Sequence, residues 1–277
     1  MRTFPQQLIQ RSRRIRAERM AFVCLLVAVA LTSCTNASTV RRSPSEQALG
    51  RYSEGMEELL SGNYTEAIGQ FHRVVRSPGY VKYAALARLR IGDALFLQEK
   101  FDAAIETYRS FLRQYEGNPN SGYAQFRIGH AFFEQIPSGW FLAPPIYERQ
   151  QTFVKHAATE LRRFAQFYPT NRLVPQAQEM LDDCERLLFE HEHFAADFYR
   201  NRNKPKGVII RLERAFRKYP EIAGSDEESY VMLAKAYADT ERFDEARAMF
   251  ASYLERFPDG SFRDQAEESL DALRTVQ

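Results

Sequence analysis

A short pattern of small and aromatic residues occurs three times along this chain, and it limits the possible folds more than any other feature. Segments 62–68, 99–105 and 241–246 each place an aromatic residue three positions before an alanine. A second aromatic residue follows four positions after each alanine. A small residue lies twelve positions before the same alanine, at Gly55, Gly92 and Ala234. Such self-similarity is the signature of a repeat array.

Prolines that follow an aromatic residue mark further boundaries in the array. Pro169, Pro220 and Pro258 each follow Tyr or Phe, and each is expected to end a helix. Strand signals are scarce after residue 46, so the pattern predicts helices. It resembles the tetratricopeptide repeat, a 34-residue helix-turn-helix. In such a hairpin, small side chains let two helices approach closely and large aromatics fill the space between hairpins.

Two further hairpins are predicted from looser matches. The third begins near Gly129, and its second helix, which contains Ala157, Leu161 and Phe164, follows an insertion that includes Trp140-Phe141. The fourth pairs a long helix at about 174–199 with a second at about 206–219, and Val208 takes the alanine position.

The chain ends with an amphipathic segment at 262–273, which is predicted to cap the open end of the array. The sequence therefore predicts an all-α fold, a right-handed superhelical solenoid of about five tetratricopeptide-like hairpins plus a C-terminal capping helix. The repeat domain is expected to span 47–277.

The N-terminal end carries an export signal. An arginine-rich start precedes an apolar block at 20–31, which has signal-peptide length and is short for a membrane span. Leu31-Thr32-Ser33-Cys34 then resembles the lipobox of bacterial lipoproteins. We expect residues 1–33 to be removed as a signal peptide and Cys34 to carry acyl chains that anchor the protein. Ordinary signal cleavage and twin-arginine export through Ser12-Arg13-Arg14 are the alternatives.

Removal of residues 1–33 changes the charge and the cysteine content. They hold six arginines and one glutamate, so the formal net charge falls from +2 to −3, which gives no reason to expect nucleic-acid binding. Cys184 is left without a disulfide partner in the mature chain. Residues 34–46 are expected to form a flexible tether. Thr35 stands where inner-membrane lipoproteins have Asp, so the resemblance implies the outer membrane and its periplasmic face.

Enzyme chemistry has little support in the sequence. Glu190-His191-Glu192-His193 is the one cluster that resembles a set of metal ligands, but neighbours two apart on a helix point to different faces. Nucleotide-binding glycine patterns and nucleophile elbows are missing. We expect no enzyme activity, no metal and no cofactor; an envelope enzyme that uses this cluster is the alternative from another class.

The first helices of the N-terminal hairpins are expected to line a peptide-binding groove. Aromatics with interspersed arginines suit an extended apolar peptide that ends in a carboxylate. The alternative for each residue is the core between repeats. The candidates are Tyr52, Met56, Leu89, Arg90, Phe96, Tyr123, Phe126 and Arg127.

Several motifs together resemble the BamD family of lipoproteins, which assemble β-barrels in the outer membrane. The family's long fourth-repeat helix matches here at Leu188, Glu192, Ala196, Phe198 and Tyr199. Its aromatic-proline repeat ends match Phe167-Tyr168-Pro169 and Arg217-Lys218-Tyr219-Pro220. The segment Ile146-Tyr147-Glu148-Arg149-Gln150 and the Trp140-Phe141 insertion depart from the family pattern.

This resemblance implies a scaffold with two kinds of partner. The N-terminal hairpins would bind the C-terminal targeting strand of unfolded outer-membrane precursors, and the C-terminal half would dock on a BamA-like barrel subunit, with Arg217 in an ion pair. Other assembly lipoproteins are further possible partners. The alternatives within this class are a secretin pilotin and a coordinator of envelope constriction.

Overall fold

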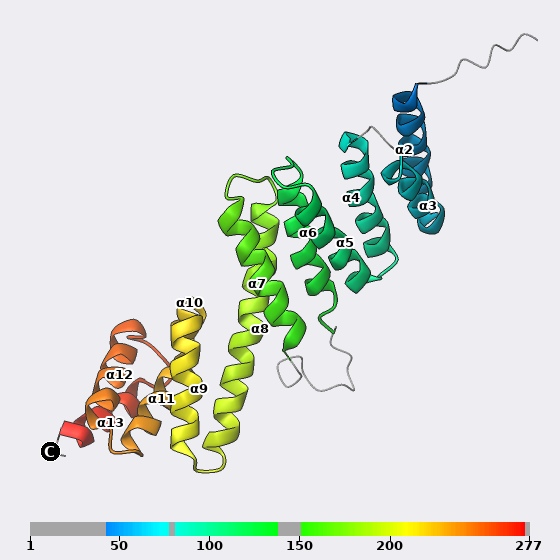
Figure 1. Ribbon diagram of the computed structural model, residues 1–277. Helices are drawn as coiled ribbons and strands as arrows, with labels where there is room; N and C mark the ends of the chain where they lie inside the picture. Colours follow the sequence, from blue (N-terminus) through cyan, green and yellow to red (C-terminus); the bar gives the residue numbers. More distant parts are fainter. Residues whose placement is uncertain (1–42, 78–80, 138–150, 275–277) are drawn as a thin grey trace, which may run out of the picture. The chain divides into compact units, whose positions relative to one another are not determined.

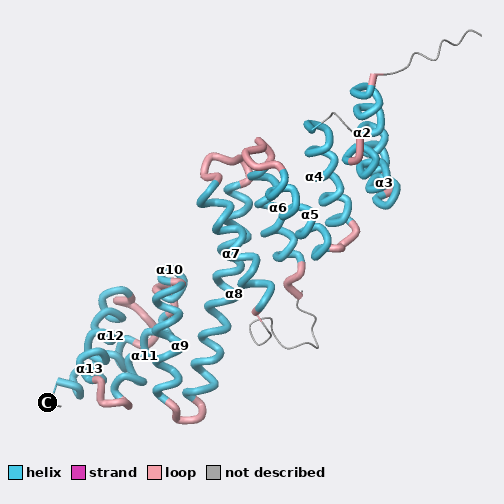
Figure 2. The backbone as a smooth tube through the Cα atoms, in the orientation of Figure 1, coloured by secondary structure: helices cyan, strands magenta, loops and turns pink. Residues whose placement is uncertain are grey.

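The computed structural model describes residues 43–77, 81–137 and 151–274, and the regular elements within these ranges are all α-helices (Figure 2). This confirms the predicted all-α fold. Within the same ranges no helix combines the length and the apolar character needed to cross a membrane. The helices are α2 (Pro44–Leu60), α3 (Tyr64–Val75), α4 (Val81–Leu97), α5 (Phe101–Gln114), α6 (Ser121–Glu134), α7 (Thr152–Phe167), α8 (Val174–Arg200), α9 (Pro205–Lys218), α10 (Pro220–Ala223), α11 (Glu227–Ala238), α12 (Phe243–Arg256) and α13 (Arg263–Arg274).

Several sequence predictions fall partly or wholly outside the described residues. The signal peptide, Cys34 and the Trp140-Phe141 insertion lie outside them, as does most of the expected tether. The last three tether residues, 44–46, are already part of α2. The chain divides into two compact units, Met1–Glu46 and Gln47–Gln277, and the contacts described below lie within the second.

Consecutive helices pack against each other in chain order, as their labels in Figure 1 allow the reader to follow. Each helix from α3 to α8 packs on the helix that follows it. In the same way α11 packs on α12, and α12 packs on α13. The short helix α10 was not predicted; it lies against α8 and α9, while α9 packs directly on α11. Packing between neighbours is the arrangement expected of a helical solenoid.

Small residues are required where the two helices of a hairpin come together. A Cβ added to Gly55 would lie 2.7 Å from Cε1 of Phe71, and one added to Gly92 would lie 2.6 Å from Cε1 of Tyr108. Gly129 has the same role, because its Cβ would lie 2.8 Å from Cδ2 of Leu161. The close approach expected of the small residues is therefore confirmed, and the rings of Phe71 and Tyr108 lie against the small residue within their own hairpins.

The pattern also extends to the degenerate repeats. Each small residue is followed sixteen positions later by a large buried side chain, except in the third hairpin, which contains the insertion. Ala196 precedes Leu212 in this way, and Ala234 precedes Phe250; all four are almost fully buried. The five hairpins of the prediction thus share one packing rule.

Four hairpin turns within the described ranges share a residue in the left-handed conformation. Gly62, Glu99, Asn203 and Glu241 have φ angles of +82°, +59°, +49° and +61°. The amide of the next residue donates to a carbonyl five positions earlier, as from Lys100 to Leu95 at 2.9 Å. This bond closes the end of the first helix. Of these four turns, the first uses glycine and the others hold a side chain in a conformation that glycine adopts at least cost.

The aromatic-proline pairs end helices as predicted. Helices α7, α9 and α12 end two residues before Pro169, Pro220 and Pro258. The residue just before each proline has a φ angle between −132° and −124°, outside the helical region. This is the restriction that a following proline imposes on its neighbour.

Buried side chains form separate clusters along the chain. One cluster joins α4 to α8 and contains Cys184, which is fully buried. Another joins α8, α9 and α11 to α13, and a third joins α2, α3 and α4. Burial, and then the nearby Asp183 and Glu185, raises the pKa of Cys184 to about 12, so this thiol is a small core side chain.

Two glycines in the first hairpin test the packing rule. Gly55→Ala is expected to destabilise the protein by about 1–3 kcal/mol, because the ring of Phe71 is fully buried and cannot move away freely. Gly69→Ala, in α3 with open space around it, is expected to stabilise by about 0.5–1 kcal/mol through helix propensity. Urea unfolding of both variants measures the two effects, and equal effects of the two substitutions would contradict the rule.

Candidate functional site

The eight predicted groove residues divide into two groups. Leu89 and Phe126 are core side chains with 1% and 3% of their surface exposed, so they cannot line a groove. The other six are partly exposed, on α2, α4 and α6. Met56 and Tyr52 pack on the cluster of the first hairpin, and the ring of Tyr52 lies 5.7 Å from that of Phe71.

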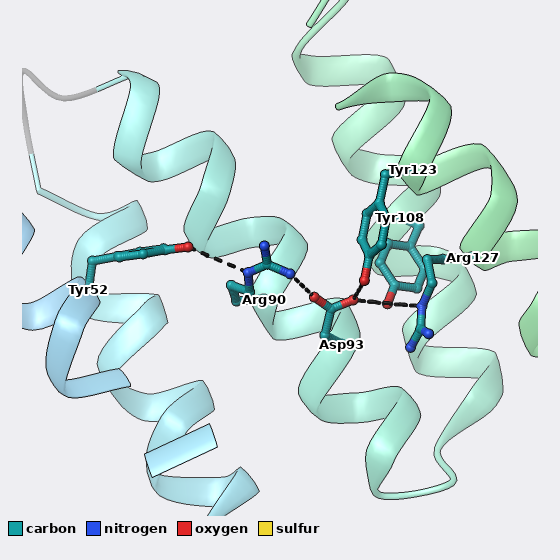
Figure 3. A network of polar contacts seen from close by, with 6 residues as sticks. All are labelled: Tyr52, Arg90, Asp93, Tyr108, Tyr123 and Arg127. Atoms are coloured by element: carbon teal, nitrogen blue, oxygen red, sulfur yellow. Dashed lines mark hydrogen bonds and ion pairs between the residues drawn. The ribbon is translucent and has the colours of Figure 1, made fainter. Parts of the chain in front are cut away.

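The buried carboxylate of Asp93 joins most of the six partly exposed residues. Asp93 on α4, with 6% of its surface exposed, accepts hydrogen bonds from the hydroxyls of Tyr108 at 2.6 Å and Tyr123 at 2.7 Å. Nη1 of Arg90 donates to its other oxygen at 2.5 Å, and Nε of Arg127 lies 3.7 Å from the oxygen that accepts from the two tyrosines. Figure 3 shows the four side chains converging on Asp93 from α4, α5 and α6.

The network extends to both sides of Asp93. On one side, Nε of Arg90 donates to the hydroxyl of Tyr52 at 3.4 Å, which links the network to α2 (Figure 3). On the other, Nε of Arg127 donates to the hydroxyl of Tyr108 at 3.2 Å, and its guanidinium lies 3.8 Å from the centre of the Phe96 ring. A cation over an aromatic face at this distance is attracted by it. The polar chain therefore spans three successive hairpins.

Ionisation states in the network follow from burial and from Asp93. Burial, and then the charge of Asp93, raises the pKa of Tyr123 to about 12 and that of Tyr108 well above its usual value, so both hydroxyls stay protonated donors at neutral pH. Burial lowers the pKa of Arg90, but its bonds to Tyr52 and Asp93 raise it by more. Both arginines are therefore charged.

The network carries one more positive than negative charge. Two guanidinium groups share the single carboxylate of Asp93, and their side chains remain 31% (Arg90) and 15% (Arg127) exposed. With aromatic rings beside them, they form a partly desolvated cationic surface. Such a surface can bind a carboxylate, because a guanidinium presents paired donors to an anion.

Sequence reasoning missed three members of this site. Asp93, Tyr108 and His130 were not among the candidates, although Asp93 is a lone acid within the apolar segment 84–97. His130 lies beside Phe96 with ring centres 4.9 Å apart, and Nε2 lies 3.0 Å from Oε1 of Glu134. Burial, and then the nearby Arg127, lowers the pKa of His130, so it is mainly neutral at pH 7. The sequence feature that could have identified Asp93 is its position directly after Gly92, the small residue of the repeat pattern.

The residues predicted in the C-terminal half lie apart from this network. Arg217 is exposed near the end of α9, and within the described part of the chain it has no ion-pair partner. On the same helix, Arg211 and Arg214 donate to Glu192 of α8 at 3.2 and 3.3 Å. Arg217 is thus available to a partner, whereas its two neighbours are held by Glu192.

The predicted metal-like cluster is dispersed by the fold. Nε2 of His193 lies 3.5 Å from Asp226 and 4.0 Å from Glu228, both close to the start of α11. Glu192 is instead bound by the two arginines of α9. Among the residues that the structure describes, no group of three or more His, Cys, Asp or Glu side chains is arranged to hold a metal ion.

Two protein-family models match parts of this chain. The model of the YfiO family, described as an outer membrane lipoprotein, matches residues 44–238, and a tetratricopeptide repeat model matches residues 228–260. Among solved structures, the TPR2AB-domain:pHSP90 complex of yeast Sti1 aligns with 83% of this chain and 91% of that chain, at 16% identity and a TM-score of 0.40.

Two curated relatives carry the name outer membrane protein assembly factor BamD. The protein from Caulobacter vibrioides is 25% identical over 207 residues, which cover 75% of this chain and 65% of that protein. The protein from Haemophilus influenzae is 25% identical over 211 residues, which cover 75% of this chain and 79% of that protein. The match thus spans less than two thirds of the Caulobacter relative.

The charge of Asp93 is expected to stabilise the N-terminal hairpins. Asp93→Asn keeps the shape but leaves buried donors poorly satisfied, so it should lower the free energy of unfolding by about 1–3 kcal/mol. Asp182→Asn on the exposed face of α8 is the matched control, with an expected change below about 0.5 kcal/mol. Urea unfolding measures both, and a variant at Asp93 as stable as the control would contradict this role.

Proposed function

Because the chain belongs to the YfiO family of outer membrane lipoproteins, we propose that it is a non-enzymatic adaptor in the assembly of β-barrel proteins in the outer membrane. The single observation that carries the proposal is the family match over residues 44–238, which includes every helix of the Asp93 network. The names of the two curated relatives support the same role.

In this proposal the protein is held at the membrane by lipid. Cys34 of the lipobox is acylated after removal of residues 1–33, and the repeat domain lies on the periplasmic side of the outer membrane. Each buried methylene contributes about 0.8 kcal/mol, so two or more acyl chains give stable anchoring without a spanning helix.

The Asp93 network is the proposed peptide site. The C-terminal carboxylate of an unfolded barrel precursor binds the surplus charge of Arg90 and Arg127, and its apolar side chains pack on Phe96, Tyr52, Tyr123 and Met56. Because Asp93, Tyr108 and Tyr123 fix the two arginines before a ligand arrives, little ordering is needed on binding.

The C-terminal half is the proposed docking region for the barrel subunit. Arg217 is exposed and has no partner within the described residues, so it can form an ion pair with an acidic residue of another protein. Electrostatic pairs of this kind set the orientation and the rate of association.

Peptide binding can be tested with a synthetic peptide that ends in an aromatic residue. The free acid is expected to bind about tenfold more tightly than the C-terminal amide, since charge-assisted hydrogen bonds contribute about 1.5–3 kcal/mol. Arg127→Gln should abolish this preference, whereas Arg113→Gln on the exposed face of α5 should preserve it. Fluorescence anisotropy measures the affinities, and equal binding of the acid and the amide would rule out the carboxylate site.

Docking can be tested by co-purification of the barrel subunit from detergent-solubilised envelopes. Arg217→Glu is expected to reduce the recovered barrel subunit several-fold because it places like charges together. Arg172→Glu, an exposed charge reversal between α7 and α8, is the control. Circular dichroism should show unchanged helical content in both variants. Undiminished recovery with Arg217→Glu would count against this docking surface.

A further inference from the structure

A cavity of about 580 Å³ lies in the C-terminal half, away from the Asp93 network. It is bounded by the end of α8, the turn into α9, one face of α11 and the start of α13. This volume is within the range of sites that bind small ligands and short peptide segments. Neither Arg217 nor any residue of the proposed peptide site contributes to its lining.

The cavity has an apolar floor. Val208, Val231 and Met232 line it, and each is almost fully buried in the cluster that joins α8, α9 and α11 to α13. Phe262 covers one side from just before α13. A ligand that reaches this floor must therefore present an apolar side chain.

The rim carries unequal numbers of available charges. Arg200 is engaged by Asp197 at 2.5 Å and by Glu228 at 2.8 Å. Lys204 and Lys235, which also line the cavity, are exposed and form no ion pair with the described residues. Asp239 is the one unengaged carboxylate on the rim, so the available charge is positive.

Backbone geometry holds Lys204 at the rim. Asn203 adopts the left-handed conformation with φ of +49°, and the amide of Lys204 donates to the carbonyl of Tyr199 at 3.0 Å. The following Pro205 fixes the first turn of α9. Lys204 therefore belongs to a closed turn, and Lys235 of α11 lines the same cavity.

From these features we propose that the cavity is a second peptide site, which takes an internal segment of a partner protein with acidic side chains next to an apolar one. The apolar side chain lies on Val231 and Met232, and the carboxylates pair with Lys204 and Lys235. Ammonium groups act as point charges on flexible stems, so they suit separate side-chain carboxylates better than a single bidentate anion.

The test uses a fluorescein-labelled decapeptide of alternating Glu and Leu, acetylated and amidated so that no terminal carboxylate is present. It should bind the full repeat domain at least tenfold more tightly than the same peptide with Gln in place of Glu. Lys204→Glu and Lys235→Glu should each weaken binding about tenfold, and Asp239→Asn should strengthen it about twofold. Lys218→Glu, an exposed reversal at the far end of α9, should leave it unchanged.

Methionine methyl signals locate the bound peptide. In protein labelled with ¹³C at the methionine methyl groups, the Met232 signal should shift on binding, whereas that of Met56, beside the Asp93 network, should stay in place. The Arg127→Gln variant, which alters the Asp93 network, should bind the acidic peptide as tightly as the unaltered protein does. The two peptide sites are therefore tested independently of each other. Absence of binding at 1 mM peptide, equal binding of the Gln peptide, or a shift at Met56 alone would overturn the proposal.

Discussion

The close approach of paired helices depends on one position in each hairpin that has no bulky side chain. In the second hairpin this position is Gly92, and the ring of Tyr108 occupies the space that a Cβ would fill. Because Asp93 is the next residue, the same approach brings the Tyr108 hydroxyl to 2.6 Å from its carboxylate. The packing rule of the repeat therefore also places the Tyr108 hydroxyl within hydrogen-bond distance of Asp93.

Much of the helical framework could be predicted from the sequence because its signals are local. The aromatic-proline pairs gave the ends of α7, α9 and α12, and the long α8 was predicted to within one residue. The capping helix α13 was displaced by one residue from its expected range. Helix α10 was missed because four residues after a proline carry no periodic pattern.

The site was predicted less well because burial depends on neighbours that a single helix does not reveal. Helix α4 is covered by α3 and α5, so Leu89 is in the core although it lies next to Arg90 in sequence. Phe126 on α6 is buried for the same reason, between α5 and α7. Asp93 was overlooked because an acid within an apolar helix has meaning only once its hydrogen-bond donors, on other helices, are known.

Helix α8 contributes side chains to two different cores. Its N-terminal part, through Leu188, belongs to the cluster with α4 to α7, and Ala196 belongs to the cluster with α9 and α11 to α13. Because α8 is one continuous helix, its backbone joins the two cores directly. The helical turns between Leu188 and Ala196 are therefore where unfolding of the two cores is coupled, and weakening these turns is expected to divide one melting transition into two.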